Sequence, residues 1–361
     1  MRLLKENEIE QYSRQIVLNE IGFDGQERIK NATVTIIGTG GLGTPIAQQL
    51  VAMGIGKLRI VDRDVVEISN LHRQILYGPD DIGLPKAEVA ADKLKILNPN
   101  VEIIPIVNSI NDYTATKIIE DSDVVLDGLD SISARYALNN ACVKLKIPYV
   151  FGSAIETTGS VTTIVPNETP CLECFQPNLK DENMPKCSIQ GVHPSILNII
   201  STIQVAESIR LITKKKPLLG GKIFFSDIST LSFDKIKIIK QEACEICGKN
   251  TKNKTYVNWK FIENICSRES GKSVHIITPK EDLKISSANI KNIIKQKGYK
   301  IRKEGKLGIT FQIDEKINIS LINNGISIIT GANTESNALE IFEKIVNNNA
   351  NTNESVIKNK N

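Results

Sequence analysis

The sequence has few aromatic residues, no long apolar run and little net charge, and each of these features excludes a class of protein. Aromatic residues make up 5% of the 361 residues, and 45 basic side chains face 41 acidic ones, for a formal charge of +4. Because no basic stripe carries stacking residues, nucleic-acid binding is not expected. No apolar segment is long enough for a signal peptide or a membrane span, so we expect a cytoplasmic globular enzyme.

The first part of the chain alternates strand-like and helix-like segments. A β-branched run at 33–39 breaks into glycines, and a helical pattern follows over 42–53. Further apolar runs at 57–62, 101–107, 123–127 and 147–151 are separated by helix-like stretches around 85–97, 113–120 and 131–145. This alternation predicts an α/β protein with a Rossmann-like, doubly wound parallel sheet.

The pattern changes after Gly152. Strand-like segments at 158–166, 222–227 and 231–239 flank one long amphipathic helix at 196–212, which predicts that the sheet continues into an antiparallel part. We expect this first domain to span 1–248, with a polar Lys/Asn linker at 249–255. A small α+β domain of ferredoxin-like type should follow over 256–346, with a disordered tail over 347–361.

A glycine cluster separates the first predicted strand from its helix. Gly38, Gly40, Gly41 and Gly43 lie where backbone N–H groups and a helix dipole receive phosphate oxygens, and Asp62 ends the next strand, where a carboxylate reaches ribose hydroxyls. The cluster predicts a nucleotide site. A glycine turn that only packs helix on strand is the alternative, and on this evidence alone a dinucleotide-dependent oxidoreductase is the first interpretation.

Four of the seven cysteines form two Cys-x-x-Cys pairs, Cys171 with Cys174 and Cys244 with Cys247. Together they offer the four soft ligands of a closed, structural zinc site. A redox dithiol is disfavoured because each pair follows a proline-containing or strand-ending turn and not the helix start of a thioredoxin-like unit. Among the other cysteines, Cys142 lies in a helix-like stretch of the core, and Cys266 lies in the helix-like segment FIENICSRES.

The stretch 62–74, DRDVVEISNLHRQ, resembles the MoeB/ThiF adenylyltransferases, which are relatives of the ubiquitin-activating enzymes. The resemblance covers roughly the first 248 residues and includes both cysteine pairs. It implies a ribose contact for Asp62, triphosphate contacts for the residues that follow, and a magnesium ligand. These further residues are Asn70, Arg73 and Lys86 for the triphosphate and Asp130 for Mg²⁺. The YSRQ element implies that Arg14 reaches the ATP of the other subunit of a homodimer.

The resemblance implies a reaction in which ATP adenylates the C-terminal Gly-Gly carboxylate of a ubiquitin-like sulfur-carrier protein and pyrophosphate leaves. Arg73, Lys86 and Mg²⁺ would stabilise the negative charge that builds on phosphate oxygens. Without the surrounding motif, Arg73 would be interpreted as a partner in a surface salt bridge, and Lys86 as a solvated lysine in the first turn of a helix. Asp130 reads as a helix N-cap, and Asp127 is a rival magnesium ligand.

Cys187 lies in the loop 176–195, near the position of a cysteine that some relatives use for persulfide or thioester chemistry, and a functional and a passive role are equally open. His193 is a weaker candidate in the same loop. The segment 256–346 has no cysteine-centred loop of the rhodanese kind. An NAD-dependent oxidoreductase and a non-catalytic scaffold for a ubiquitin-like partner remain as alternatives. The carrier's pathway is open among molybdenum cofactor, thiamine, tRNA thiolation and protein conjugation.

Overall fold

A computed structural model describes the chain over 3–181, 190–252, 254–256, 260–266 and 273–346. Contacts divide the chain into two compact units. The first unit comprises Met1–Val61, His72–Leu76 and Ala90–Asn258, and the second comprises Asp62–Leu71, Tyr77–Val89 and Trp259–Asn361. The predicted tail at 347–361 lies outside the described residues.

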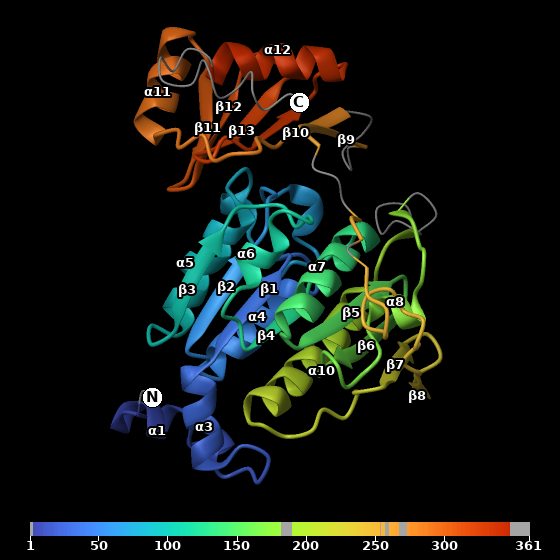
Figure 1. The fold of residues 1–361 in the computed structure, drawn as a ribbon. Coiled ribbons are helices and arrows are strands. Elements are labelled where there is room, and N and C mark those ends of the chain that lie inside the picture. The colour runs from blue at the N-terminus through green and yellow to red at the C-terminus, as the bar shows by residue number, and fades with distance from the viewer. Residues whose placement is uncertain (1–2, 182–189, 253, 257–259, 267–272, 347–361) are drawn as a thin grey trace. The chain divides into compact units, whose positions relative to one another are not determined.

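An eight-stranded sheet forms the centre of the first unit, in the order β3-β2-β1-β4-β5-β6-β7-β8 (Figure 1). Its strands are β1 (Thr33–Ile37), β2 (Lys57–Val61), β3 (Glu102–Ile106), β4 (Val124–Asp127), β5 (Tyr149–Ile155), β6 (Thr158–Ile164), β7 (Lys222–Asp227) and β8 (Ser232–Lys237). The strands from β3 to β5 pair in parallel, and β5 to β8 pair antiparallel. The predicted doubly wound sheet with an antiparallel continuation is confirmed.

Helices cover both faces of this sheet. The helices of this unit are α1 (Glu6–Gln11), α2 (Ser13–Ile16), α3 (Gly22–Asn31), α4 (Gly43–Ala52), α5 (Lys86–Leu97, which begins in the second unit), α6 (Ala115–Ile119), α7 (Ile132–Leu145), α8 (Leu172–Phe175) and α10 (Pro194–Ile212). On β5, Phe151 packs in one core with residues of α6 and α7, whereas a Cβ on Gly152 would contact Gln204 of α10. Successive strand residues point to opposite faces, so α7 and α10 cover different sides of the sheet.

Helix α10 is the long amphipathic helix that the sequence predicts, and it starts two residues earlier, at Pro194. It is long and apolar enough to cross a membrane by composition, yet more than half of that stretch is buried inside the protein. Its exposed side chains recur every three or four residues, at Ser195, Asn198, Thr202 and Ala206. This spacing leaves one narrow polar strip, so α10 is a core helix of the first unit.

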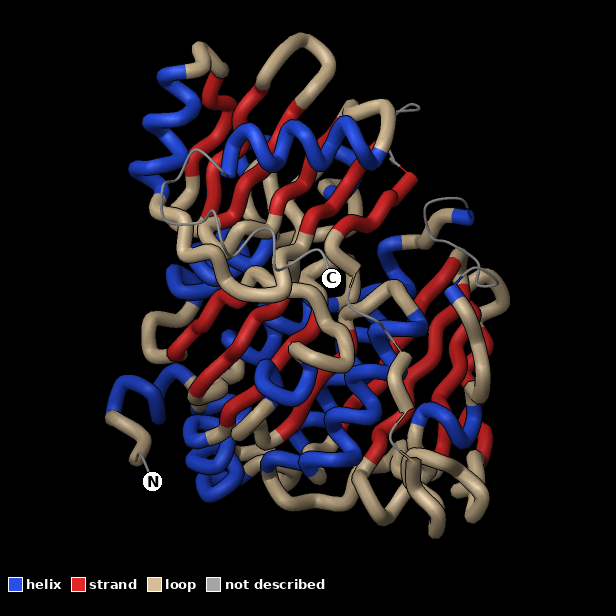
Figure 2. Tube along the Cα trace, turned by 45° about the horizontal axis from the view of Figure 1, so that its top comes forward, coloured by secondary structure: helices blue, strands red, loops and turns tan. Residues whose placement is uncertain are grey.

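A six-stranded antiparallel sheet forms the second unit, in the order β11-β12-β13-β14-β10-β9. Its elements are β9 (Ile262–Cys266), β10 (Ser273–Ile277), α11 (Ser287–Gln296), β11 (Lys300–Glu304), β12 (Gly308–Gln312), β13 (Asn318–Ile322), β14 (Ser327–Thr330) and α12 (Glu335–Val346). Both helices contribute to its core, where Ile290, Phe311 and Phe342 are buried, and Figure 2 shows α12 lying across the strands.

Two expectations for this segment need correction. A ferredoxin-like unit has the order β-α-β-β-α-β, whereas the described elements follow β-β-α-β-β-β-β-α because four consecutive strands form a meander. Cys266 ends strand β9 and does not lie in a helix. The segment around it mixes polar and apolar residues without a clear period, and pairing with β10 decides its conformation.

Candidate nucleotide and metal sites

The predicted glycine loop joins β1 to α4 at the carboxyl edge of the parallel strands, where open α/β sheets bind ligands. Gly38 has φ +89°, and a Cβ there would lie 2.5 Å from the carbonyl oxygen of Gly128. Gly40 is open instead, since a Cβ would meet only Nε2 of Gln74, at 3.8 Å. The first glycine therefore permits the close approach of two loops, and the second leaves backbone accessible to a ligand.

The other two glycines of the predicted loop are required by packing. A Cβ on Gly41 would lie 2.6 Å from Cδ1 of Leu197 in α10, and a Cβ on Gly43 would lie 1.9 Å from the carbonyl oxygen of Gly38. Both contacts bring α4 close to its neighbours. Packing alone accounts for glycine at these two positions, and a nucleotide contact there stays a prediction.

Asp127, the last residue of β4, is completely buried and fully hydrogen-bonded. Its carboxylate accepts bonds from Nε of Arg135 at 3.0 Å, the hydroxyl of Tyr149 at 2.5 Å and the backbone N–H of Leu129 at 2.9 Å. Burial raises its pKa, although the Arg135 guanidinium opposes this shift. A carboxylate enclosed in this way has no access to an ion, whereas Asp130 is exposed. The geometry therefore favours Asp130 over Asp127 as a magnesium ligand.

The start of α7 is capped by residues other than Asp130. Ser131 is the N-cap and accepts a bond from the backbone N–H of Ala134 at 3.3 Å. The carboxylate of Asp181 accepts bonds from the N–H of Ile132 at 2.7 Å and of Ser133 at 3.3 Å. The N-cap alternative for Asp130 is therefore wrong. No local pattern in the sequence predicts the role of Asp181, because it is 49 residues from the N–H of Ile132 that it accepts.

Arg73 and Gln74 belong to the first unit. The guanidinium of Arg73 is half-exposed and lies 3.4 Å from Nε2 of His72. Gln74 is buried, and within the described residues its Oε1 has no hydrogen-bond partner. In this part of the motif, the guanidinium of Arg73 is therefore accessible to a ligand, and the adjacent amide of Gln74 is buried.

In the second unit, the motif folds as a tight loop around Lys86. An isolated bridge pairs Val65 with Pro85, and the backbone N–H of Lys86 donates to the carbonyl of Asp64 at 2.9 Å. The amine of Lys86 is buried and lies 3.0 Å from Oδ2 of Asp64. Burial acts to lower the pKa of Lys86, but Asp64, Asp62 and Glu67 outweigh it and raise the pKa. The lysine is therefore a fixed positive charge and not a solvated surface residue.

Asn70 is 1% exposed and uses only part of its hydrogen-bonding capacity. Its Oδ1 accepts a bond from the N–H of Glu67 at 3.1 Å, while its Nδ2 has no partner among the described residues. A buried donor without a partner is costly unless a ligand satisfies it. A phosphate oxygen fits this requirement, because it accepts a hydrogen bond and Asn70 offers one. These assignments to ATP remain predictions from the resemblance.

The four predicted zinc ligands come together. Sγ of Cys171 lies 3.6 Å from that of Cys244, Sγ of Cys174 lies 3.4 Å from that of Cys247, and all four sulfurs lie within 4.8 Å of one another. A disulfide needs about 2.05 Å. Four thiolates around zinc at about 2.3 Å stand roughly 3.8 Å apart, so the residues fit the metal.

Cys171 is the N-cap of α8, a helix of only four residues in the segment after β6. The metal interpretation stands on the second pair, which brings two more sulfurs to the same point. Cys142, by contrast, is a core residue of α7, and burial raises the pKa of its thiol.

The YSRQ element is anchored by its first and last residues. The hydroxyl of Tyr12 accepts a bond from Nδ2 of Asn98 at 2.8 Å, and its ring fills space that only glycine leaves at Gly54. Nε2 of Gln15 donates to the carbonyl of Met53 at 2.8 Å. Arg14, between them on α2, is exposed. The element therefore holds its backbone firmly and presents the arginine to the surface.

The two candidates of the loop 176–195 have different outcomes. Cys187 lies outside the described residues. His193 is the N-cap of α10, where its Nδ1 accepts a bond from the N–H of Ser195 at 3.2 Å. A capping role accounts for this histidine.

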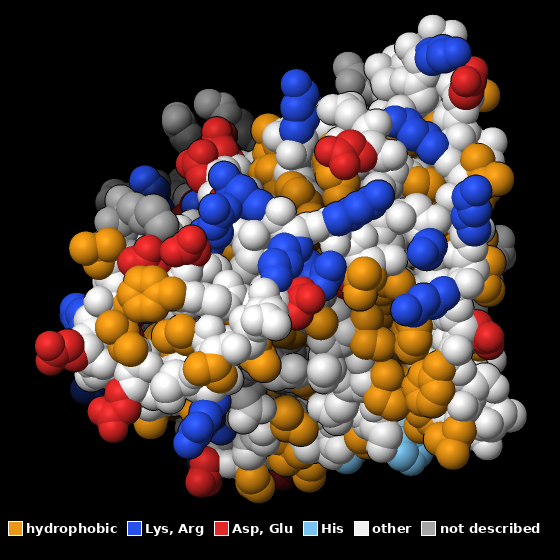
Figure 3. Space-filling model, turned by 90° about the horizontal axis from the view of Figure 1, so that it is seen from below, with side chains coloured by type: hydrophobic (Ala, Val, Ile, Leu, Met, Phe, Trp, Pro, Cys, Tyr) orange, Lys and Arg blue, Asp and Glu red, His pale blue; other side chains and the backbone are white. Residues whose placement is uncertain are grey.

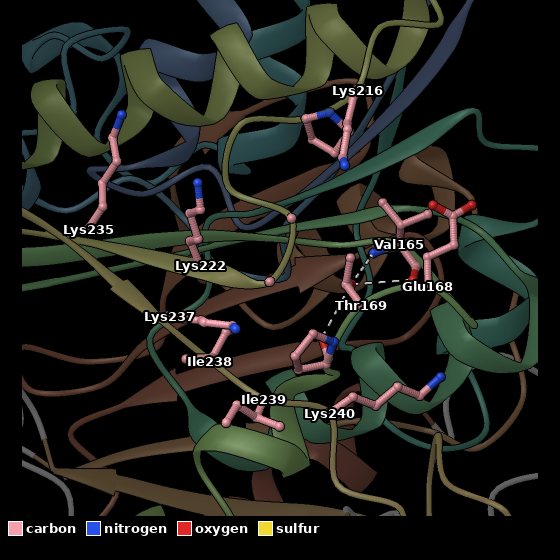
Figure 4. A pocket seen from close by; sticks show the side chains of 14 residues that line it. Val165, Glu168, Thr169, Lys216, Lys222, Lys235, Lys237, Ile238, Ile239 and Lys240 are labelled. Carbon is pink, nitrogen blue, oxygen red and sulfur yellow. Dashed lines mark hydrogen bonds between the residues drawn. The ribbon is translucent and has the colours of Figure 1, made fainter.

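A lysine-rich pocket of about 670 Å³ lies at the other edge of the sheet, where β6 ends and β7 begins (Figure 4). Its lining includes Lys216, Lys222, Lys235, Lys237 and Lys240. Lys240 donates to the carbonyl of Asn167 at 2.8 Å. No local sequence pattern predicts this pocket, because its lysines come from two loops and two strands.

Comparison with known proteins places these features in a family. The model of the ThiF family matches residues 12–247. The molybdopterin-synthase adenylyltransferase of Salmonella typhimurium is 36% identical over 249 residues, 69% of this chain and 100% of the relative.

The adenylyltransferase and sulfurtransferase MOCS3 of Culex quinquefasciatus is 31% identical over 349 residues, 94% of this chain and 79% of the relative. Among solved structures, Escherichia coli MccB with ATP is 26% identical with a TM-score of 0.59, over 68% of this chain and 76% of that one. The family match covers the glycine loop, the 62–74 motif and both cysteine pairs, and the chain belongs to the ThiF family.

Proposed function

We propose that this chain is an adenylyltransferase that uses ATP to activate the C-terminal Gly-Gly carboxylate of a ubiquitin-like sulfur-carrier protein. The observation that carries the proposal is the state of Asn70, a buried amide whose Nδ2 has no partner in the described residues. A dinucleotide-binding loop of an oxidoreductase has no need of this donor or of the buried cation of Lys86. Relatives at 35–36% identity are named adenylyltransferases.

The proposed reaction is an attack of the carrier's carboxylate oxygen on the α-phosphorus of ATP. The new bond joins carboxylate oxygen to phosphorus, the bond to the bridging oxygen breaks, and pyrophosphate leaves with that electron pair. No general base is needed, because the carboxylate is already ionised at neutral pH. Arg73 and Lys86 stabilise the charge on the leaving group.

A bound Mg²⁺ would neutralise part of the triphosphate charge, and Asp130 is its proposed ligand. The zinc site has a different role. Its four cysteines join the segment after β6 to the segment after β8, about seventy residues later, so the metal stabilises the fold and takes no part in chemistry.

We also propose a homodimer in which Arg14 reaches the ATP of the partner subunit. Support comes from large apolar side chains that lie near it in the sequence and remain exposed in the first unit: Leu3, Ile9, Val17, Leu18 and Phe23. Figure 3 shows hydrophobic side chains exposed among Lys, Arg, Asp and Glu side chains on the face seen from below. A twofold interface would cover apolar groups of this kind and place a planar guanidinium against phosphate.

Adenylation is the one reaction in the proposed function, although one relative is named both adenylyltransferase and sulfurtransferase. The segment 256–346 contains one cysteine, Cys266, at the end of a strand. Cys187 is not required for the proposed first step, because displacement at phosphorus needs cations and orientation and no thiol. Cys187→Ser should therefore leave adenylate formation intact.

The test is ATP–pyrophosphate exchange with a carrier that ends in Gly-Gly. Exchange should require the carrier and Mg²⁺, and it should disappear when the terminal glycine of the carrier is removed, because the attacking carboxylate is then displaced. Lys86→Met should abolish exchange with the zinc content unchanged. Carrier binding without exchange would support the scaffold alternative, and NADH oxidation would support the oxidoreductase.

A further inference from the structure

Within the second unit, the carboxylate of Glu88 is held by a turn that lies more than two hundred residues away in sequence. Glu88 is in the first turn of α5, two residues after Lys86, and is 6% exposed. Its Oε1 accepts the backbone N–H of Lys306 at 2.6 Å, and its Oε2 accepts the N–H of Leu307 at 2.9 Å. Consecutive backbone N–H groups that converge on one carboxylate form an anion-binding nest.

This turn joins β11 to β12, and its first residue, Gly305, leaves room for the carboxylate of Glu88. A Cβ added at Gly305 would lie 2.7 Å from Oε2 and 2.8 Å from Oε1 of Glu88. Its backbone does not require glycine for conformational reasons, since its φ is not in the left-handed region. Glycine at 305 is therefore explained by the approach of Glu88 and not by the geometry of the hairpin.

The same hairpin binds the loop on the other side of Lys86. The hydroxyl of Thr310 donates to the carbonyl of Gly83 at 2.5 Å, and the amine of Lys303 donates to the carbonyl of Asp80 at 2.7 Å. Lys86 thus lies between two points of the chain, Gly83 and Glu88, that both make hydrogen bonds with the β11–β12 hairpin. An ion pair from Arg63 to Glu263, at 2.7 Å, adds a contact beside Asp62.

We propose that the β11–β12 hairpin is a positioning element for Lys86, so that the C-terminal segment of this chain sets the affinity for ATP. The inference rests on the proposed function, because it needs Lys86 to bind the triphosphate. Glu88 acts as a positioning residue: it fixes the first turn of α5 and, through it, the direction of the Lys86 amine. A cation whose side chain is already ordered before ATP arrives binds ATP more tightly, because binding then costs no further conformational entropy of that side chain.

Two single substitutions and their combination test this role in the full-length protein. Glu88→Ala removes the carboxylate, and Gly305→Ala displaces it from the opposite side. Each should weaken ATP binding about tenfold in calorimetry. The double variant should bind ATP no more weakly than Glu88→Ala alone, because the methyl group added at position 305 no longer contacts a carboxylate. Asp92→Asn, an exposed acid on α5, and Lys300→Ala, an exposed residue of β11, are matched controls that should bind ATP normally.

Hydrogen exchange at the amides of Lys306 and Leu307 reports on the contact without any reference to ATP. Both amides should lose protection in Glu88→Ala and Gly305→Ala and keep it in the two controls. Lost protection with unchanged ATP affinity would overturn the positioning role, as would additive effects in the double variant. If the wild-type protein does not bind ATP, the proposed function is refuted. Hydrogen exchange at Lys306 and Leu307 would still show whether the contact with Glu88 exists, so the two failures can be told apart.

Discussion

Nε of Arg135 lies 3.0 Å from Oδ2 of Asp127, and both side chains are buried, at 9% and 0% exposure. Arg135 also donates to the carbonyl of Gly152 at 2.9 Å, so this ion pair ties the end of β4 to β5. The pair therefore fixes the edge of the sheet from which Asp130 extends.

Replacement of Arg135 by leucine should lower the free energy of unfolding by about 3–5 kcal/mol, because Asp127 would be left as an uncompensated buried charge. Urea unfolding measures this loss. Asp130→Asn is the control: it should change stability by less than about 0.5 kcal/mol yet remove Mg²⁺-dependent exchange. A mild Arg135→Leu phenotype would show that the pair is not a structural tie.

The purified protein should contain one zinc per chain, bound by Cys171, Cys174, Cys244 and Cys247. Chelation should unfold the segments around these residues, because the metal closes a long loop and supplies folding energy directly. Elemental analysis and thermal unfolding with and without chelator measure both effects. If the double variant Cys171→Ser and Cys244→Ser still contains one zinc per chain, these cysteines are not the zinc ligands.

Arg14→Ala should abolish pyrophosphate exchange with the fold intact, because Tyr12 and Gln15 still anchor the element. Mixing this variant with Asp130→Ala should restore activity, since each heterodimer then contains one site built from two intact halves. The maximum is about half of the wild-type sites in a heterodimer. A mixture that stays inactive after confirmed subunit exchange would contradict the role of Arg14 in the partner's site.

Glu8 of α1 is buried and forms an ion pair with the partly buried Lys30 of α3. Burial acts to raise the pKa of Glu8, but the bonds from Lys30 and from the Lys5 backbone outweigh it and lower the pKa below its ordinary 4.5. The unfolded chain thus binds more protons, and the stabilisation is present above pH 4.5 and lost as the pH falls through the lowered folded value. Glu8→Gln should cost about 1.5–3 kcal/mol at pH 7.

The cost of Glu8→Gln should disappear at a pH below the folded pKa, as measured by urea unfolding at several pH values. The exposed neighbour substitution Glu10→Gln should show neither the loss nor its pH dependence. A loss that persists at low pH would mean that shape, and not charge, accounts for the effect.

Lys222 lies directly opposite Lys237 across β7 and β8, and in the described part of the chain no carboxylate pairs with either amine. Like charges in opposite positions destabilise a strand pair. Lys237→Glu should therefore raise stability by roughly 0.2–1 kcal/mol, and Lys235→Glu, opposite Phe224, should raise it less. Equal effects of the two substitutions would show that the cross-strand repulsion is negligible.

Local signals accounted for much of the protein. The strands from β1 to β8 were predicted because each is a short apolar run between turn residues, and the cysteine pairs were predicted because their spacing is chemically specific. The contacts of Asp181 with α7 and of Glu88 with the β11–β12 hairpin could not be found in this way. In both contacts, a carboxylate accepts hydrogen bonds from backbone N–H groups that are far away in the sequence. Every residue except proline has such a group, so the sequence does not indicate which one will be used.

The sequence by itself determined the doubly wound sheet and the four cysteines that the structure brings together, because periodicity and Cys-x-x-Cys spacing are local patterns. The residues proposed to bind ATP were also chosen from local motifs, chiefly the one at 62–74. Only the tertiary structure decided that Asp127 is enclosed by Arg135 and Tyr149 while Asp130 stays exposed, and that the Nδ2 of Asn70 is buried without a partner in the described residues. Burial and hydrogen-bond satisfaction depend on what other segments bring to a side chain, and folding alone sets them.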